Sequence, residues 1–222
     1  MTKKEVHRFA QEHLLAALPG YGVRGNLLYR MPVKDILGAF CFERSGWDKQ
    51  SCAISVFVQP LYVPHEQIHF GFGMRLGFKT DKWWTLVGTD CPAVASDILL
   101  HIKKQGLPFL DLGSTPISFV NHIGRVLSSF NRMDDNQVQR ALAYSYLWIG
   151  NYGKSLETMD RMLANNRGPK RDDRDWAQEL VKEVACMREE TAKNPNGASE
   201  QLRQWRLQTL RAIGFEDVAE PV

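Results

Sequence analysis

The chain has 222 residues, of which 44% are hydrophobic and 24% charged, a composition typical of a folded protein with one large domain or two small ones. Residues 1–150 carry 16 Lys and Arg against 12 Asp and Glu, and residues 151–222 carry 12 against 13, so neither part has the basic excess of a nucleic-acid-binding protein. Because the N-terminus lacks the apolar core of a signal peptide and no run of about 18 apolar residues occurs, we expect a cytoplasmic protein that does not enter a membrane.

The first predicted element is an amphipathic helix. Thr2 and Glu5 have the spacing of a capping box, in which each side chain bonds the backbone N–H of the other residue. Apolar residues then recur at helical spacing as far as Leu18, and Pro19 and Gly20 end the pattern. We expect this helix to bury one face.

Two strands are predicted next, because the side chains alternate with a period of two over residues 36–44 and 52–60. The segment between them, "SGWDKQS", is too short for the crossover that a parallel pair needs. Residues 68–76 alternate in the same way and predict a further strand. Together these segments indicate an antiparallel meander.

The stretch "HEQIH" holds His65, Glu66 and His69 in the spacing of a helical zinc site. Such a site needs a helix, which stacks residues four apart on one face. The alternation that follows indicates a strand instead, and in an extended chain the two histidines lie about 13 Å apart. We therefore predict no metal site here.

The cysteines also show no spacing that suggests a metal site. Cys41, Cys52, Cys91 and Cys186 are scattered, without a C-x-x-C pair. This pattern favours buried free thiols in a reducing compartment. We expect neither a metal nor a cofactor.

After about residue 90 the pattern becomes helical. Pro92 and Pro116 stand where first-turn prolines belong, and Asp134 and Asp135 can cap a later helix. The predicted helices cover residues 91–106, 115–130, 134–149, 152–164, 174–193 and 199–214, with loops at 165–173 and 194–199.

The predicted fold class is therefore α+β. Residues 1–133 are expected to form a domain in which the N-terminal helix packs on the antiparallel meander, followed by two helices. Residues 134–222 are expected to form an all-α region.

Within that region, residues 135–165 resemble one tetratricopeptide repeat. The matching positions are Leu142, Ala143, Tyr146, Gly150, Tyr152 and Ser155. Gln139 departs from the pattern, since a tryptophan is usual there, and Arg167 replaces the closing proline. An ordinary helical hairpin with a glycine turn explains the segment equally well. Either interpretation implies packing and partner binding rather than catalysis.

The front of the chain, over residues 3–130, resembles an uncharacterised bacterial domain family found beside toxin and immunity genes. The resemblance lies in the order of elements and in the motifs "GYGVRGNLLYR" and "GLPFLDLGS". It carries over no catalytic residues. It implies a protein that binds and blocks a partner, such as an immunity or inhibitory protein for a toxin-like partner.

We therefore expect a non-enzymatic protein that binds another protein. The candidate partner-binding residues are Trp83, Trp84, Gln59, Tyr146 and Tyr152. One of the two adjacent tryptophans should point into the core and the other outward, where it serves either internal packing or an interface.

Two other functions remain open. A hydrolase or nuclease could use Glu43, His69 and Arg75 if they converge on one face of the sheet, although such residues also suit a solvated face. The Arg-rich stretch at residues 167–175, with Arg203, Arg206 and Arg211, could meet nucleic acid, but interleaved aspartates nearly cancel its charge.

Overall fold

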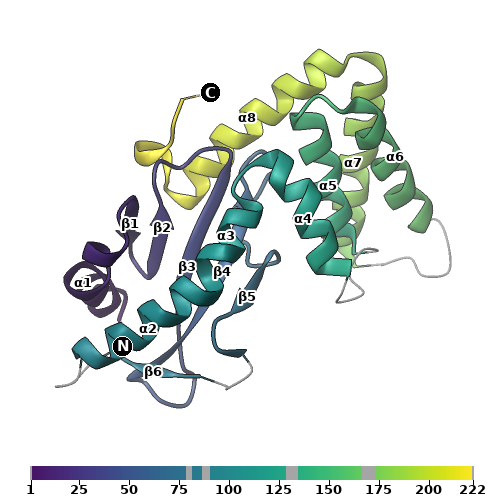
Figure 1. Ribbon diagram of the computed structural model, residues 1–222. Coiled ribbons are helices and arrows are strands. Elements are labelled where there is room, and N and C mark those ends of the chain that lie inside the picture. Colours follow the sequence, from purple (N-terminus) through teal and green to yellow (C-terminus); the bar gives the residue numbers. More distant parts are fainter. Residues whose placement is uncertain (1, 79–81, 87–90, 129–134, 167–173, 222) are drawn as a thin grey trace. The chain divides into compact units, whose positions relative to one another are not determined.

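The computed structural model describes residues 2–78, 82–86, 91–128, 135–166 and 174–221, and it confirms the α+β class (Figure 1). The chain divides into two compact units. The first comprises Met1–Gln59, His69–Ser114 and Val218–Glu220, and the second comprises Pro60–Ile68, Thr115–Asp217 and Pro221–Val222.

The first unit is built on a six-stranded sheet of the order β1-β2-β3-β4-β5, with β6 also paired to β4. The strands are β1 Tyr21–Arg24, β2 Leu27–Arg30, β3 Ile36–Arg44, β4 Ser51–Pro60, β5 Gly73–Arg75 and β6 Trp84–Thr85. The pairs β1–β2, β2–β3, β4–β5 and β4–β6 are antiparallel, as the meander prediction requires. The strands β1 and β2 are supplied by the motif "GYGVRGNLLYR".

The predicted strand at residues 68–76 is wrong in its first half. Pairing with β4 runs only from the carbonyl of Phe72 to the N–H of Leu76. Before it the chain turns, because the N–H of Gly71 donates to His69 Nδ1 and the Phe70 ring packs edge-on against Phe57 at 4.8 Å. These side-chain contacts outweigh the alternation of residue types.

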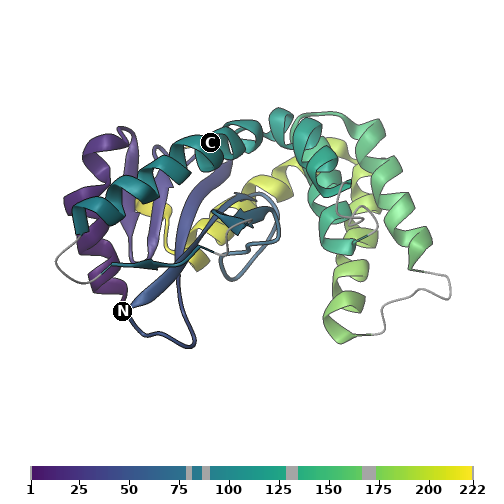
Figure 2. The same cartoon turned by 60° about the horizontal axis from the view of Figure 1, so that its bottom comes forward.

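Helices form a layer on the sheet in the first unit (Figure 2). The helix α1 (Lys3–His13) begins with the predicted capping box and packs beside β1, and a short 3-10 turn, η1 (Leu15–Ala17), follows it. The helix α2 (Cys91–His101) runs without a break through a π-helical turn, η3 (Ile102–Gly106), into α3 (Leu107–Gly113).

Glycines let this continuous helix approach the strands closely. A Cβ atom on Gly106 would lie 2.3 Å from the Phe40 ring, and one on Gly113 would lie 3.0 Å from Val58. Phe40 and Val58 are completely buried, so the core of the first unit lies between this helix and β3 and β4.

The second unit contains five helices within the described residues. They are α4 Pro116–Ser128, α5 Asn136–Trp148, α6 Tyr152–Asn165, α7 Asp175–Lys193 and α8 Pro195–Ile213, and a 3-10 turn, η4 (Glu216–Val218), follows them. The expected cap at Asp135 is present, because its carboxylate accepts the N–H of Gln137 at 2.8 Å. The helix α8 ends at Gly214, whose φ of 72° is the left-handed conformation that favours glycine.

The loop predicted at residues 194–199 is wrong, because α8 already begins there. The Asn194 side chain accepts the N–H of Gly197 at 3.0 Å, and Pro195 occupies the first helical position. An Asn-Pro pair is therefore a helix start here. The other predicted loop, at 165–173, lies mostly outside the described residues.

The two units differ from the predicted domains, 1–133 and 134–222, in the segments that each contains. The helix α4, expected in the first domain, groups with the second unit, as does the segment Pro60–Ile68. In the first unit, Val33 donates to the carbonyl of Val218 and accepts the N–H of Glu220, so residues near the C-terminus bond to the sheet domain.

The close approach of the helix to the sheet gives the first prediction. Gly106→Ala should lower the free energy of unfolding by about 1–3 kcal/mol, because the new methyl group overpacks a buried ring. Gly153→Ala is the matched control, since nothing lies within 4 Å of its Cβ position in α6. It should be neutral or stabilise by up to about 1 kcal/mol. Urea unfolding measures both, and equal effects would contradict the packing.

Candidate functional site

The helix α5 is the central element of the second unit. Residues Val138 to Ser145 are all buried, and each face of the helix meets another segment of the unit. A helix buried on every side is held by specific contacts rather than by one apolar stripe. Those contacts determine which of its side chains remain accessible.

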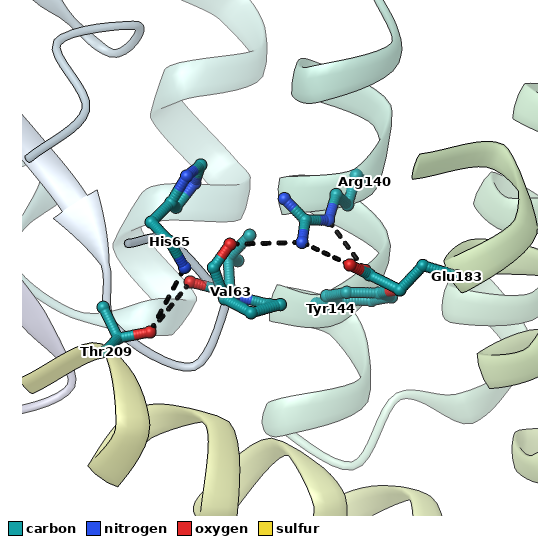
Figure 3. Close-up of polar contacts among 7 residues, drawn as sticks. Val63, His65, Arg140, Tyr144, Glu183 and Thr209 are labelled. Atoms are coloured by element: carbon teal, nitrogen blue, oxygen red, sulfur yellow. Dashed lines mark hydrogen bonds and ion pairs between the residues drawn. The ribbon is translucent and has the colours of Figure 1, made fainter. Parts of the chain in front are cut away.

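One face of α5 carries a charged cluster (Figure 3). Arg140 is 5% exposed and binds Glu183 of α7 through two N–H···O contacts of 2.8 and 2.6 Å. The Tyr144 hydroxyl donates to the same carboxylate at 2.7 Å. Burial, and then the neighbouring carboxylate, raise the pKa of Tyr144 well above its ordinary value, so this hydroxyl stays a donor.

The same face holds the segment Pro60–Ile68. Arg140 donates to the carbonyl of Pro64 at 3.2 Å. Thr209 of α8 donates its hydroxyl to the carbonyl of Val63 and accepts the N–H of His65, both at 3.4 Å (Figure 3). The segment therefore has its backbone bonded by the helices of the second unit, although it lies between two strands in the sequence.

An aromatic stack completes the attachment of this segment. The Tyr62 ring lies parallel to Trp148 at 4.7 Å, and its hydroxyl hydrogen-bonds the hydroxyl of Ser145 at 2.8 Å. Tyr62 is fully buried. The face of α5 that carries Ser145 and Trp148 is thus occupied by the chain itself.

The next face of α5 packs on α6. Ser155 is buried and donates its hydroxyl to the carbonyl of Ala143 at 2.8 Å. Gly150, with a φ of 76°, forms the turn between the two helices. The small residues therefore lie at the helix contact, where the sequence pattern places them, and the hairpin exists. Its membership of the tetratricopeptide family stays a prediction.

A pocket of about 190 Å³ opens between α5 and α6. Its lining residues are Gln139, Leu142, Tyr146, Lys154, Glu157, Thr158 and Arg161. The Lys154 ammonium lies 5.6 Å from the centre of the Tyr146 ring, and Arg161 pairs with Glu157 at 3.0 Å. This pocket is the candidate site, and Tyr146 is the predicted partner-binding residue that lines it. Tyr152, at the start of α6, is only partly exposed.

The other predicted partner-binding residues have different surroundings. Gln59 is buried and accepts the N–H of His69 at 3.0 Å. Trp84 is buried and donates its indole N–H to Asp97 at 2.8 Å. Trp83 is 40% exposed and stacks under the Arg75 guanidinium at 4.3 Å. As predicted, one tryptophan points inward and the other outward.

The residues of the enzyme alternative are spread along the sheet. The N–H of Ser45 bonds to Ser51, which places Glu43 opposite Ala53. Gln59, which accepts the N–H of His69, lies six residues from Ala53 on the same strand. Six residues of an extended strand span about 20 Å. Arg75, which lies opposite Ser55, bonds to the carbonyl of Lys82 at 2.7 Å. These polar residues are separated rather than gathered around one point.

The histidines of the "HEQIH" stretch lie outside any helix, and they belong to different units. No group of three or more His, Cys, Asp or Glu residues able to hold a metal occurs in the described part of the chain. The local structure therefore lacks the helix that a zinc site of this spacing needs.

The three arginines of α8 proposed for nucleic-acid binding are either paired with carboxylates or buried. Arg203 pairs with Glu200 at 3.0 Å, Arg211 pairs with Glu216 at 2.7 Å, and Arg206 is buried. Residues 167–173 lie outside the described ranges. The side chains of Arg203 and Arg211 are exposed but their charges are balanced by these carboxylates, so the three arginines together leave no strong basic surface for phosphates.

One exposed residue was missed by the sequence reasoning. Trp47 lies in the turn between β3 and β4 and is 98% exposed. The Ser45 hydroxyl accepts the N–H groups of Trp47 and Asp48, both at 3.1 Å, and the Asp48 carboxylate accepts from Gln50 and Ser51. The signal in the sequence is a tryptophan among turn-forming polar residues, where neither strand can bury it.

No protein-family model, curated protein or solved structure matches the chain. Within the described ranges, no helix combines the length and the apolar character needed to cross a bilayer.

The cluster around Arg140 gives a second prediction. Glu183→Ala should lower the free energy of unfolding by about 3 kcal/mol, because it leaves a buried guanidinium without its carboxylate. Asp160→Ala is the matched control, since it removes a bidentate partner from the exposed Arg188. It should cost less than about 1 kcal/mol. Thermal or urea unfolding measures the difference, and similar losses would show that the cluster has no special role.

The Trp84–Asp97 contact gives a third prediction. Burial alone raises the pKa of Asp97, but the hydrogen bonds from Lys82 and Trp84 outweigh it, so the pKa lies below the ordinary value. The charged form therefore stabilises the fold above the unfolded pKa of about 3.9, and this stabilisation is lost as the pH falls.

Asp97→Asn should accordingly reduce stability most above about pH 5, and the difference from wild type should shrink below pH 4. Urea unfolding at a series of pH values checks it. A difference that stays constant across this range would mean that the Asp97 charge contributes nothing.

Proposed function

We propose that the protein acts by binding another protein, without catalysis, and that Trp47 is the anchor of the interface. The observation that carries this proposal is the 98% exposure of Trp47 on a turn held by side-chain hydrogen bonds. Trp83 and Trp176, the other exposed tryptophans in the described part of the chain, are 40% and 45% exposed and lie under arginine side chains.

The exposure of Trp47 has a physical cost. A tryptophan presents about 150–250 Å² of surface, most of it apolar, and this surface gains free energy when it leaves water. Tryptophan is also enriched among the residues that dominate interface energies. Because Ser45 and Asp48 already hold the turn, little backbone entropy is lost when a partner buries the indole.

The resemblance over residues 3–130 favours an inhibitory role, in which the protein blocks a toxin-like partner as an immunity protein does. A cytoplasmic location is part of this proposal. It is supported by the free cysteines, of which Cys41 and Cys52 are buried as expected, whereas Cys91 is partly exposed and Cys186 is exposed. Burial raises the pKa of both Cys41 and Cys52 to about 12, so these two thiols stay protonated and unreactive.

The separation of Glu43 from His69 argues against the hydrolase or nuclease alternative. General acid-base catalysis needs its groups within hydrogen-bond reach of one substrate. Their positions at opposite ends of β4 do not provide this geometry.

The fourth prediction tests the anchor. The tagged protein should capture one stoichiometric protein partner from its native extract. Trp47→Ala should weaken that complex about 30-fold, the effect of losing about 2 kcal/mol at a central contact, as titration calorimetry measures. The free energy of unfolding should change by less than about 0.5 kcal/mol, because the side chain is exposed.

Trp176→Ala is the control, since it removes a different exposed tryptophan and should leave the affinity unchanged. Failure to capture a partner, or equal affinity of the Trp47 variant and wild type, would overturn the proposed function.

A further inference from the structure

We infer that the pocket between α5 and α6 receives an acidic side chain, Asp or Glu, from a partner protein. This inference rests on the proposed function and adds a chemical class of contact to it. It concerns a site on the second unit, whereas Trp47 belongs to the first unit. The two sites can therefore be tested separately.

The two cations of the pocket differ in their surroundings. Arg161 is neutralised by Glu157, one turn away on the same helix, at 3.0 Å. Lys154 has no acidic partner within ion-pair distance in the described ranges, and its ammonium instead lies over the ring of Tyr146. Since the charges of Arg161 and Glu157 cancel, the pocket keeps one positive charge, at Lys154.

The other polar groups of the pocket favour an acceptor. The Tyr146 hydroxyl has no hydrogen-bond partner within the described residues, so it is available as a donor. The Thr158 hydroxyl already donates to the carbonyl of Lys154 at 2.7 Å. An ammonium and a phenol next to each other form the donor set that a carboxylate oxygen accepts from.

The size and charge of the pocket suit one acidic side chain better than a drug-sized ligand or a nucleic acid. About 190 Å³ is smaller than the roughly 300–1,000 Å³ of typical small-molecule sites. One unpaired cation balances one carboxylate, whereas nucleic acids need several cations to neutralise their phosphates. Leu142 adds an apolar wall. We therefore expect the acidic residue to stand next to a large apolar residue in the partner.

The two helices that form the walls of the pocket are tied together. The Ser155 hydroxyl bonds α6 to the carbonyl of Ala143 in α5, and Tyr146 lies less than one turn beyond Ala143. The opposite side of α5 is held by Arg140 and Glu183. The backbones that carry the binding groups are therefore fixed relative to each other before a ligand enters, which limits the cost of binding.

The fifth prediction uses a phage-displayed library of random nine-residue peptides, selected on the full-length protein. Wild type should enrich peptides in which Asp or Glu stands beside Leu, Ile, Met or Phe. Lys154→Glu should enrich Lys or Arg at that position instead, because it reverses the charge. Lys193→Glu is the control, since Lys193 is exposed on α7 and pairs with Glu189. It should select the same peptides as wild type.

A synthetic peptide from the wild-type selection should bind at least tenfold more weakly to Lys154→Glu, measured by fluorescence anisotropy. Its binding to Trp47→Ala should be unchanged. Selection of no peptide, of peptides without an acidic residue, or of peptides that bind Lys154→Glu equally well would each overturn the inference. The proposed function would stand in those cases, since it depends on the affinity of the Trp47 variant for the captured partner.

Discussion

The ion pair between Arg140 and Glu183 is the contact on which the second unit depends. It joins α5 to α7 and, through the carbonyl of Pro64, holds a segment that leaves β4 and returns to β5. Burying a guanidinium this deeply is costly unless it is paired, and here a carboxylate and a backbone carbonyl accept its N–H groups. The pair therefore sets the position of α5, and α5 sets which side chains line the pocket with α6.

Much of the fold could be predicted from local chemistry. The capping box at Thr2 and Glu5, the strand over residues 36–44 and the cap at Asp135 are each signalled by near neighbours in the chain. Each is present, although the strand is buried on both faces. The strand at 68–76 and the start of α8 were misjudged for opposite reasons. Contacts of Phe70 and His69 override a regular pattern in the first case, and Asn194 and Pro195 begin a helix in the second.

The candidate site was less accessible to sequence reasoning. Tyr146 was identified through its place in the helical hairpin, but the importance of Lys154 depends on Arg161 being neutralised by Glu157 while Lys154 is not. Side-chain pairing of this kind is decided in three dimensions. Gln59 and Trp84 were predicted to bind a partner from their residue types, but the tertiary structure buries both. Trp47 does have a signal in the sequence, because a tryptophan stands among polar turn residues. That signal gains meaning only once the structure shows that the side chain is exposed.

Hydrogen–deuterium exchange of the protein with and without its captured partner tests the central claim, binding through Trp47 and the α5–α6 pocket, most directly. We expect the partner to slow exchange in the turn Ser45–Gln50 and at the start of α6 around Lys154, where the backbone lies near the proposed contacts. Protection confined to other segments, with unchanged exchange in the turn and in α6, would contradict it.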